Sequence, residues 1–214
     1  MSLHGSLRKI RRQLMPFTAT KRFVSIGGVA SSSLVAHLED GDEDRIWCHS
    51  RFKHCLEPEL LPEVRRGLEV KVCFVFGDPF RAVESVFRRG LQRRHERAMT
   101  RSIRGYRPQL LKDTPLLKYL QDNVDRFFLA QHLQNWVEYS GTKVGIVAVK
   151  YEALGEHIQE VLEFLECDRP FHVRPRTPRP HDRPPEIQAG LEAMYGEVKE
   201  KIDSLPSLIR IKVG

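Results

Sequence analysis

The chain has 214 residues, of which 41% are hydrophobic and 29% are charged, a mixture typical of a globular domain rather than a disordered or fibrous chain. Lys and Arg number 35 against 28 Asp and Glu, so the net charge of +7 favours an anionic partner such as a nucleotide or a sulfated or phosphorylated ligand. The apolar runs are strand-sized, which argues against a membrane span.

The beginning of the chain is basic and has no clear periodicity. Residues 1–21 are therefore predicted to form an arm or a short helix, and residues 22–214 a single domain. The arm lacks the apolar centre of a signal peptide, and four cysteines without CxxC spacing suit a reducing compartment. These features predict a cytoplasmic protein without a metal site, although an Arg- and Ser-containing start also occurs in transit peptides.

Strand-like and helix-like segments alternate along the chain. Three apolar runs predict strands at 22–26, 70–76 and 144–149. Helical patterns follow at 31–38, after Asp78-Pro79, at 123–139, through 164–165 and at 186–204. The alternation predicts an α/β fold with a central parallel sheet and helices on both faces. Trp136 and Phe127 are expected in the core, and His132 is expected to be structural.

The first candidate site is the glycine- and serine-rich turn after the first predicted strand, in the stretch FVSIGGVASSSLVAHL. Glycines allow close approach of an anion to the backbone, and a helix N-terminus presents free N–H groups. The turn lacks the lysine of GxxxxGK[ST], which weakens an ATPase or kinase interpretation. A serine-capped helix after an ordinary turn is the structural alternative. The predicted anion-binding residues are Gly27, Gly28, Val29, Ala30, Ser31, Ser32 and Ser33.

The second candidate site is the stretch FVFGDPFRAVES at 74–85, where a buried strand turns into a helix. Ligands of open α/β sheets bind at the carboxyl ends of parallel strands. Together and in this order, the two motifs resemble the sulfotransferase family. The resemblance continues through KHCLEPELLPEVRRGLEVKVCFVFGDP at 53–79 and FLAQHLQNWVEYSGTKVGIVAVKYEALGEHIQEVLEFLEC at 128–167.

The resemblance implies a P-loop-like three-layer α/β sandwich that uses 3'-phosphoadenosine-5'-phosphosulfate as co-substrate. Gly27–Ser33 would then bind the 5'-phosphosulfate, and Ser85 would contact the 3'-phosphate. Tyr151-Glu152 matches a largely structural Tyr-Glu pair. Lys53 matches the family lysine, and His54 lies one position before the family's catalytic histidine, with His49 as the alternative base. A surface histidine without a catalytic role is the competing interpretation of His54.

The sequence departs from the family at two positions where basic residues are expected, because Ala30 and Gly77 stand there. Arginines from 88–107 or from the proline-rich stretch 174–183 are candidates to replace them. The alternative function is a catalytically degenerate sulfotransferase-fold protein that binds a nucleotide or another anionic ligand. The acceptor, a small molecule or a carbohydrate, and the oligomeric state stay open. Nucleic acid is a poorer partner, because the arginines are not interleaved with stacking aromatics.

Overall fold

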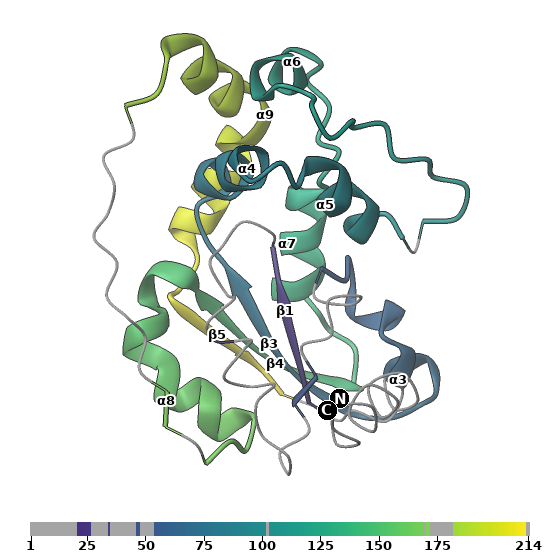
Figure 1. Cartoon of the computed structure of the whole chain (residues 1–214). Helices are drawn as coiled ribbons and strands as arrows, with labels where there is room; N and C mark the ends of the chain where they lie inside the picture. Colours follow the sequence, from purple (N-terminus) through teal and green to yellow (C-terminus); the bar gives the residue numbers. More distant parts are fainter. Residues whose placement is uncertain are drawn as a thin grey trace, which may run out of the picture.

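The fold is built on one five-stranded sheet with the strand order β2-β1-β3-β4-β5 (Figure 1). The structure is a computed structural model that describes residues 21–26, 34, 46–47, 54–101, 103–168, 170–171 and 182–212. The strands are β1 (Lys21–Ser25), β2 (Ile46–Trp47), β3 (Val70–Phe76), β4 (Val144–Lys150) and β5 (Leu208–Ile211). The first four are parallel, and β5 runs antiparallel to β4. The predicted α/β class with a mostly parallel sheet is confirmed.

The two central strands are buried on both faces. Every residue of β3 except Lys71 and every residue of β4 except Lys150 is buried. In register, Val72 lies opposite Ile146 and Phe74 lies opposite Ala148. Nearly continuous apolar, β-branched runs are typical of parallel strands covered on both sides, and for this reason both strands were recognisable in the sequence.

Helices cover both faces of the sheet. One core joins Val72, Phe74 and Phe76 to the helices α4, α6, α7 and α9, and the other joins Cys73 and Val75 to α8 (Figure 1). The helices are α3 (Pro62–Arg65), α4 (Pro79–Arg88), α5 (Gln92–Met99), α6 (Leu116–Gln121), α7 (Leu129–Val137), α8 (Leu154–Phe164) and α9 (Pro185–Ser204), with 3-10 turns η1 (Pro58–Leu60) and η2 (Tyr151–Ala153). Within the described ranges, no helix combines the length and apolar character that crossing a bilayer requires.

The helix predicted at 123–139 is shorter than expected. It begins only at Leu129, because the Asp125 carboxylate accepts hydrogen bonds from the backbone N–H groups of Phe127 (3.0 Å) and Leu129 (2.7 Å). Phe128 has a φ of 53°, which is incompatible with a continuing right-handed helix. The Tyr195 hydroxyl of α9 also donates to Asp125 at 2.8 Å. A buried capping carboxylate therefore replaces the first predicted helical turns.

An ion pair buried within the fold ties the first strand to a helix. Arg22 of β1 and Glu63 of α3 are 1% and 0% exposed, and the guanidinium binds both carboxylate oxygens, with the Nε–Oε2 distance at 2.9 Å. Phe127 and Trp136 are fully buried, as predicted. The P-loop-like character of the turn at 27–33 and the division into an arm at 1–21 and a domain at 22–214 stay predictions.

Candidate functional site

The candidate site lies where the order of the strands changes direction. The chain passes from β1 to β2 on one side, and β3 pairs with β1 on the other. At the carboxyl ends, Ser25 lies opposite Val75, and the Ile26 N–H donates to the Val75 carbonyl at 3.2 Å. Such a switch point is the usual ligand-binding crevice of an open α/β sheet. The predicted anion-binding residues 27–33 follow here in the chain but lie outside the described residues.

The half-buried His54 contacts the end of β1. Its Nδ1 lies 2.7 Å from the carbonyl oxygen of Ser25. Because a carbonyl oxygen only accepts hydrogen bonds, Nδ1 must carry the proton, and the lone pair of the neutral ring is on Nε2. The contact with Ser25 therefore assigns the Nδ1–H tautomer to the neutral His54 ring. The other two predicted catalytic residues, His49 and Lys53, lie outside the described residues.

Two further histidines, His95 and His132, lie in the core on the inner side of His54. The His95 ring meets the His54 ring edge-on, with the centroids 4.8 Å apart, and packs against Phe127 at 4.9 Å. His132 of α7 is fully buried and lies 5.3 Å from the Phe74 ring. Within the described part of the chain, His95 Nε2, both ring nitrogens of His132 and the Ser25 hydroxyl make no hydrogen bond. Unpaired buried polar atoms are uncommon and costly, so three such side chains close together are an unusual feature of this part of the core.

Sequence reasoning placed His132 correctly in a structural position but missed His95. The residue sits among eight arginines at 88–107, a segment considered above only as a source of arginines for the two positions that lack a basic residue. The buried residues of α5 are Gln92, His95, Glu96 and Met99, at i, i+3, i+4 and i+7. That spacing is the inner face of an amphipathic helix and was the signal available in the sequence.

Burial keeps the two inner histidines neutral. It lowers the pKa of His132 to about 3 and the pKa of His95 well below its usual value, and the positive charge that His54 acquires on protonation adds to both effects. The backbone of Cys55 offsets part of the change at His132, although no atom of the described residues meets the geometry of a hydrogen bond with its ring. Both inner rings are therefore neutral near pH 7.

The buried histidines predict a loss of stability in mild acid. The folded-state pKa of His132 lies below the unfolded value near 6.5, so the unfolded state binds more protons and stability falls as the pH drops from about 6.5 towards about 3. Between pH 7 and pH 5, His132 alone is expected to lower the free energy of unfolding by about 2 kcal/mol. Urea unfolding at both pH values measures this change.

Two variants separate the contribution of His132 from the general effect of acid on stability. His132→Leu is expected to reduce the pH 7 to pH 5 loss by about the same 2 kcal/mol, because the apolar side chain takes up no proton. His157→Gln is the control, since His157 is only half-buried and hydrogen-bonds Glu160 and Ser207. An unchanged pH dependence in His132→Leu would contradict the assignment of His132 as a buried neutral group.

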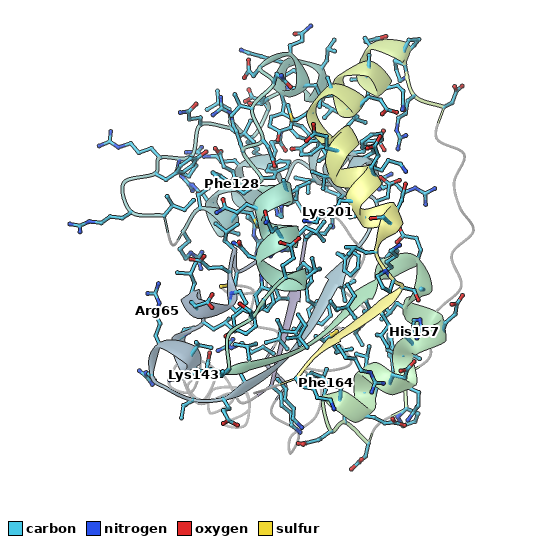
Figure 2. All side chains as sticks on the ribbon, turned by 180° about the vertical axis from the view of Figure 1, so that it is seen from behind. Arg65, Phe128, Lys143, His157, Phe164 and Lys201 are labelled. Atoms are coloured by element: carbon cyan, nitrogen blue, oxygen red, sulfur yellow. The ribbon has the colours of Figure 1, made fainter. Side chains whose placement is uncertain are left out.

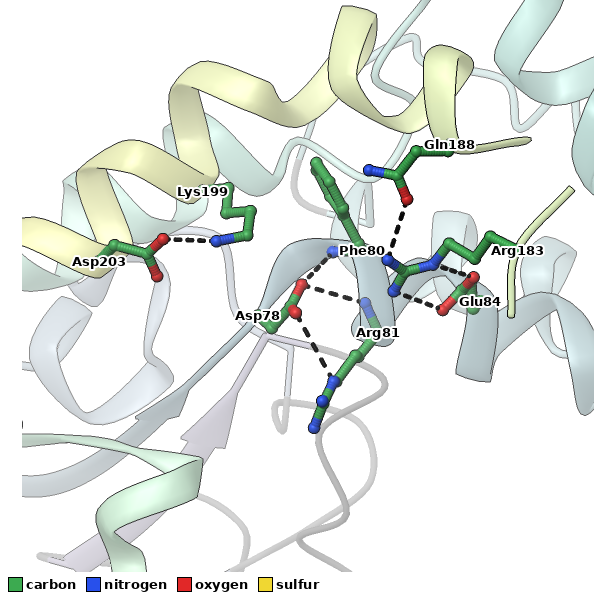
Figure 3. A network of polar contacts seen from close by, with 8 residues as sticks. All are labelled: Asp78, Phe80, Arg81, Glu84, Arg183, Gln188, Lys199 and Asp203. Atoms are coloured by element: carbon green, nitrogen blue, oxygen red, sulfur yellow. Dashed lines mark hydrogen bonds and ion pairs between the residues drawn. The ribbon is translucent and has the colours of Figure 1, made fainter. Parts of the chain in front are cut away.

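The corner between β3 and α4 is the second predicted motif (Figure 3). The Asp78 carboxylate accepts from the backbone N–H groups of Phe80 (2.8 Å) and Arg81 (3.2 Å), and Pro79 occupies the first helical turn. A Cβ atom on Gly77 would lie 3.0 and 3.2 Å from the two carboxylate oxygens of Glu152. Gly77 stands where the resemblance predicts an arginine. It is packed against Glu152, which follows directly after β4.

An arginine from the proline-rich stretch does reach α4. The Arg183 guanidinium donates to both carboxylate oxygens of Glu84, at 2.6 and 3.0 Å, and to the Gln188 side chain at 3.1 Å (Figure 3). Its carbon lies 5.6 Å from the centroid of the Phe80 ring. The hydrogen bonds with Glu84 raise the pKa of Arg183. Glu84 thus neutralises the charge of Arg183. Glu84 is next to the half-buried Ser85, which was predicted to contact a 3'-phosphate.

At the carboxyl edge, the structure places the His54 imidazole against the end of β1. Among the residues that the structure describes, no group of His, Cys, Asp and Glu side chains is arranged to hold a metal ion. The function has to be inferred from this geometry and from the motifs, because no family model, no curated protein and no solved structure matches the chain.

Proposed function

We propose that the chain is a sulfotransferase that moves a sulfuryl group from 3'-phosphoadenosine-5'-phosphosulfate to a hydroxyl or amine of an acceptor. The observation that carries the proposal is the 2.7 Å contact between His54 Nδ1 and the Ser25 carbonyl, two residues before the glycine-rich turn. With the ring proton on Nδ1, we assign to Nε2 the role of proton acceptor at the edge where an α/β sheet binds ligands. The ordered set of family-like motifs at 22–167 and the α/β fold support the same function.

The reaction needs one base and donors for the leaving group. His54 Nε2 takes the proton of the acceptor hydroxyl as its oxygen attacks sulfur. The new oxygen–sulfur bond forms while the bond from sulfur to the bridging oxygen breaks, and the electron pair stays on the 5'-phosphate of 3',5'-adenosine bisphosphate. The backbone N–H groups of Gly28–Ser33 and the ammonium group of Lys53 are the proposed donors to that phosphate.

A second candidate is a binding protein of the same ancestry without catalysis. Two observations favour it. The Glu152 carboxylate lies beside Gly77, and Glu84, the neighbour of Ser85 in the chain, neutralises Arg183. Both acidic groups disfavour a 3'-phosphate at the position that the resemblance predicts. The two candidates therefore differ in their selectivity for the doubly phosphorylated nucleotide.

Calorimetric titration with 3',5'-adenosine bisphosphate, ADP and ATP separates the candidates. A sulfotransferase is expected to bind the bisphosphate at least about tenfold more tightly than ADP, because one charge-assisted contact contributes roughly 1.5–3 kcal/mol. Equal affinities for the bisphosphate and ADP would favour the second candidate. No binding of any of the three nucleotides would contradict the sulfotransferase and would restrict the second candidate to another anionic ligand.

The glycine-rich turn is tested in the same assay with Gly28→Val. The added side chain blocks close approach of the phosphate to the backbone, and the affinity for the bisphosphate is expected to fall by about tenfold or more. Gly196→Val on α9 is the control, since the nearest atom to a Cβ there is an oxygen of Glu192 at 3.7 Å. Unchanged affinity in a correctly folded Gly28→Val protein would exclude the turn as the phosphate site.

A further inference from the structure

A hydrogen-bonded chain of three side chains links α8 to the start of β5. His157 Nδ1 lies 2.8 Å from Oε1 of Glu160, and His157 Nε2 lies 2.8 Å from the hydroxyl oxygen of Ser207. His157 and Glu160 are three residues apart on α8, so their side chains are neighbours on the helix surface. Ser207 lies 50 residues further along the chain, and Figure 2 shows His157 beside the start of β5.

The two partners fix the position of the proton on the neutral imidazole of His157. Because a carboxylate accepts hydrogen bonds and cannot donate one, Nδ1 carries the proton and donates to Glu160. The lone pair of the ring is then on Nε2, which accepts the hydrogen bond from the Ser207 hydroxyl. A hydroxyl that donates to an imidazole, which a carboxylate orients in turn, is the arrangement of an activated serine nucleophile.

Two members of this triad are also held by the sheet. The Arg210 guanidinium of β5 binds the second carboxylate oxygen of Glu160, so Oε1 is left to His157. The hydrogen bonds from His157 and Arg210 lower the pKa of Glu160, which keeps its carboxylate ionised near neutral pH. The Ser207 carbonyl accepts a hydrogen bond of 2.9 Å from the backbone N–H of Lys150, the last residue of β4. The serine and the carboxylate therefore have fixed positions on either side of the imidazole.

The triad is open to solvent and lies away from the first candidate site. The side chains of His157 and Glu160 are 21% and 40% exposed, and Ser207 is half-buried. Ser207 precedes β5, whereas His54 contacts the end of β1, and the strand order puts β3 and β4 between them. At a spacing of about 4.8 Å, three strand steps amount to about 14 Å. In addition, α8 and α7 pack on opposite faces of the sheet. His54 and His157 therefore belong to separate sites.

We propose that Ser207 and His157 are the catalytic residues, and Glu160 the positioning residue, of a second active site that hydrolyses carboxylic esters. Ser207 Oγ attacks the carbonyl carbon while its proton moves to His157 Nε2, and the ester C–O bond then breaks as the leaving alkoxide takes that proton. Water hydrolyses the acyl-serine by the same route: His157 accepts a proton from water, returns it to Ser207 Oγ, and the carboxylic acid leaves. Esters are favoured over amides because an alcohol or a phenol leaves more readily than an amine.

The test combines a covalent label with an ester substrate. A fluorophosphonate forms a bond from phosphorus to Ser207 Oγ as fluoride leaves, and peptide mass spectrometry locates the adduct. We expect the label on Ser207, and we expect Ser207→Ala to remove part of the hydrolysis of 4-nitrophenyl acetate. His157→Gln is expected to slow the labelling and this Ser207-dependent hydrolysis by at least about 10²-fold. Ser204→Ala is the matched control, because Ser204 is an exposed serine at the end of α9 and should keep both wild-type rates.

Glu160→Gln tests the positioning role. We expect kcat for the Ser207-dependent hydrolysis to fall at least about tenfold while KM stays unchanged, because Glu160 contacts the imidazole and not the ester. An adduct that is absent from Ser207, or that forms equally fast in His157→Gln, would overturn the site. His54→Ala is expected to keep the wild-type rate of ester hydrolysis, and a loss there equal to that in His157→Gln would assign the hydrolysis to the first site instead.

Discussion

His54→Ala is expected to lower turnover by about 10²–10⁴-fold with an acceptor that the wild-type protein sulfates. The variant removes the imidazole whose Nδ1 contacts the Ser25 carbonyl and whose Nε2 is the proposed proton acceptor. Affinity for 3',5'-adenosine bisphosphate should change little, because the base contacts the acceptor rather than the nucleotide. Steady-state kinetics and calorimetry on the same preparation measure both quantities.

Two controls make this result specific. His157→Gln on α8 alters a half-buried histidine that pairs with Glu160 and should keep wild-type turnover. His49→Ala tests the alternative base, because His54 lies one position before the catalytic histidine of the family motif. Wild-type turnover in both His54→Ala and His49→Ala would place the base elsewhere.

Glu63→Gln is expected to destabilise the protein by about 3–5 kcal/mol at pH 7. Glu63 is 0% exposed, and its carboxylate neutralises the buried guanidinium of Arg22 on β1. An amide of the same shape removes the negative charge that faces the buried guanidinium, which costs more than the lost hydrogen bonds alone. Urea unfolding monitored by circular dichroism measures the difference.

The control for this variant is an ion pair at the surface. Glu166 is 60% exposed and pairs with Lys21 and Lys71, so Glu166→Gln is expected to cost less than about 1 kcal/mol. A loss below 1 kcal/mol in Glu63→Gln would mean that water or a rearrangement compensates Arg22. In that case the pair would not fix the position of β1.

Much of the fold was predictable because its signals are local. The apolar runs at 70–76 and 144–149 are long enough to identify buried strands without tertiary information. Asp78-Pro79 correctly predicted the start of α4, since an Asp cap and a Pro in the first turn determine a helix start through residues that are adjacent in the sequence. The final helix was predicted to begin within one residue of its observed start at Pro185.

The remaining features depend on contacts between distant segments. The edge strand β5 is short, and its pairing with β4 follows from packing rather than from its own pattern. The start of α7 is fixed by Asp125, one of whose hydrogen-bonding partners, Tyr195, is 70 residues away. The contact between His54 and His95 likewise joins two segments that look like ordinary polar surface in the sequence. The hydrophobic periodicity of a single segment does not predict which distant segment it will contact.

A structure of the protein bound to 3',5'-adenosine bisphosphate tests the central claim most directly. The account predicts that the 5'-phosphate contacts the backbone N–H groups of Gly28–Ser33 and that His54 Nε2 faces the phosphate oxygen to which sulfur is attached in the donor. A nucleotide bound at another edge of the sheet, or with its 5'-phosphate turned away from His54, would contradict the account.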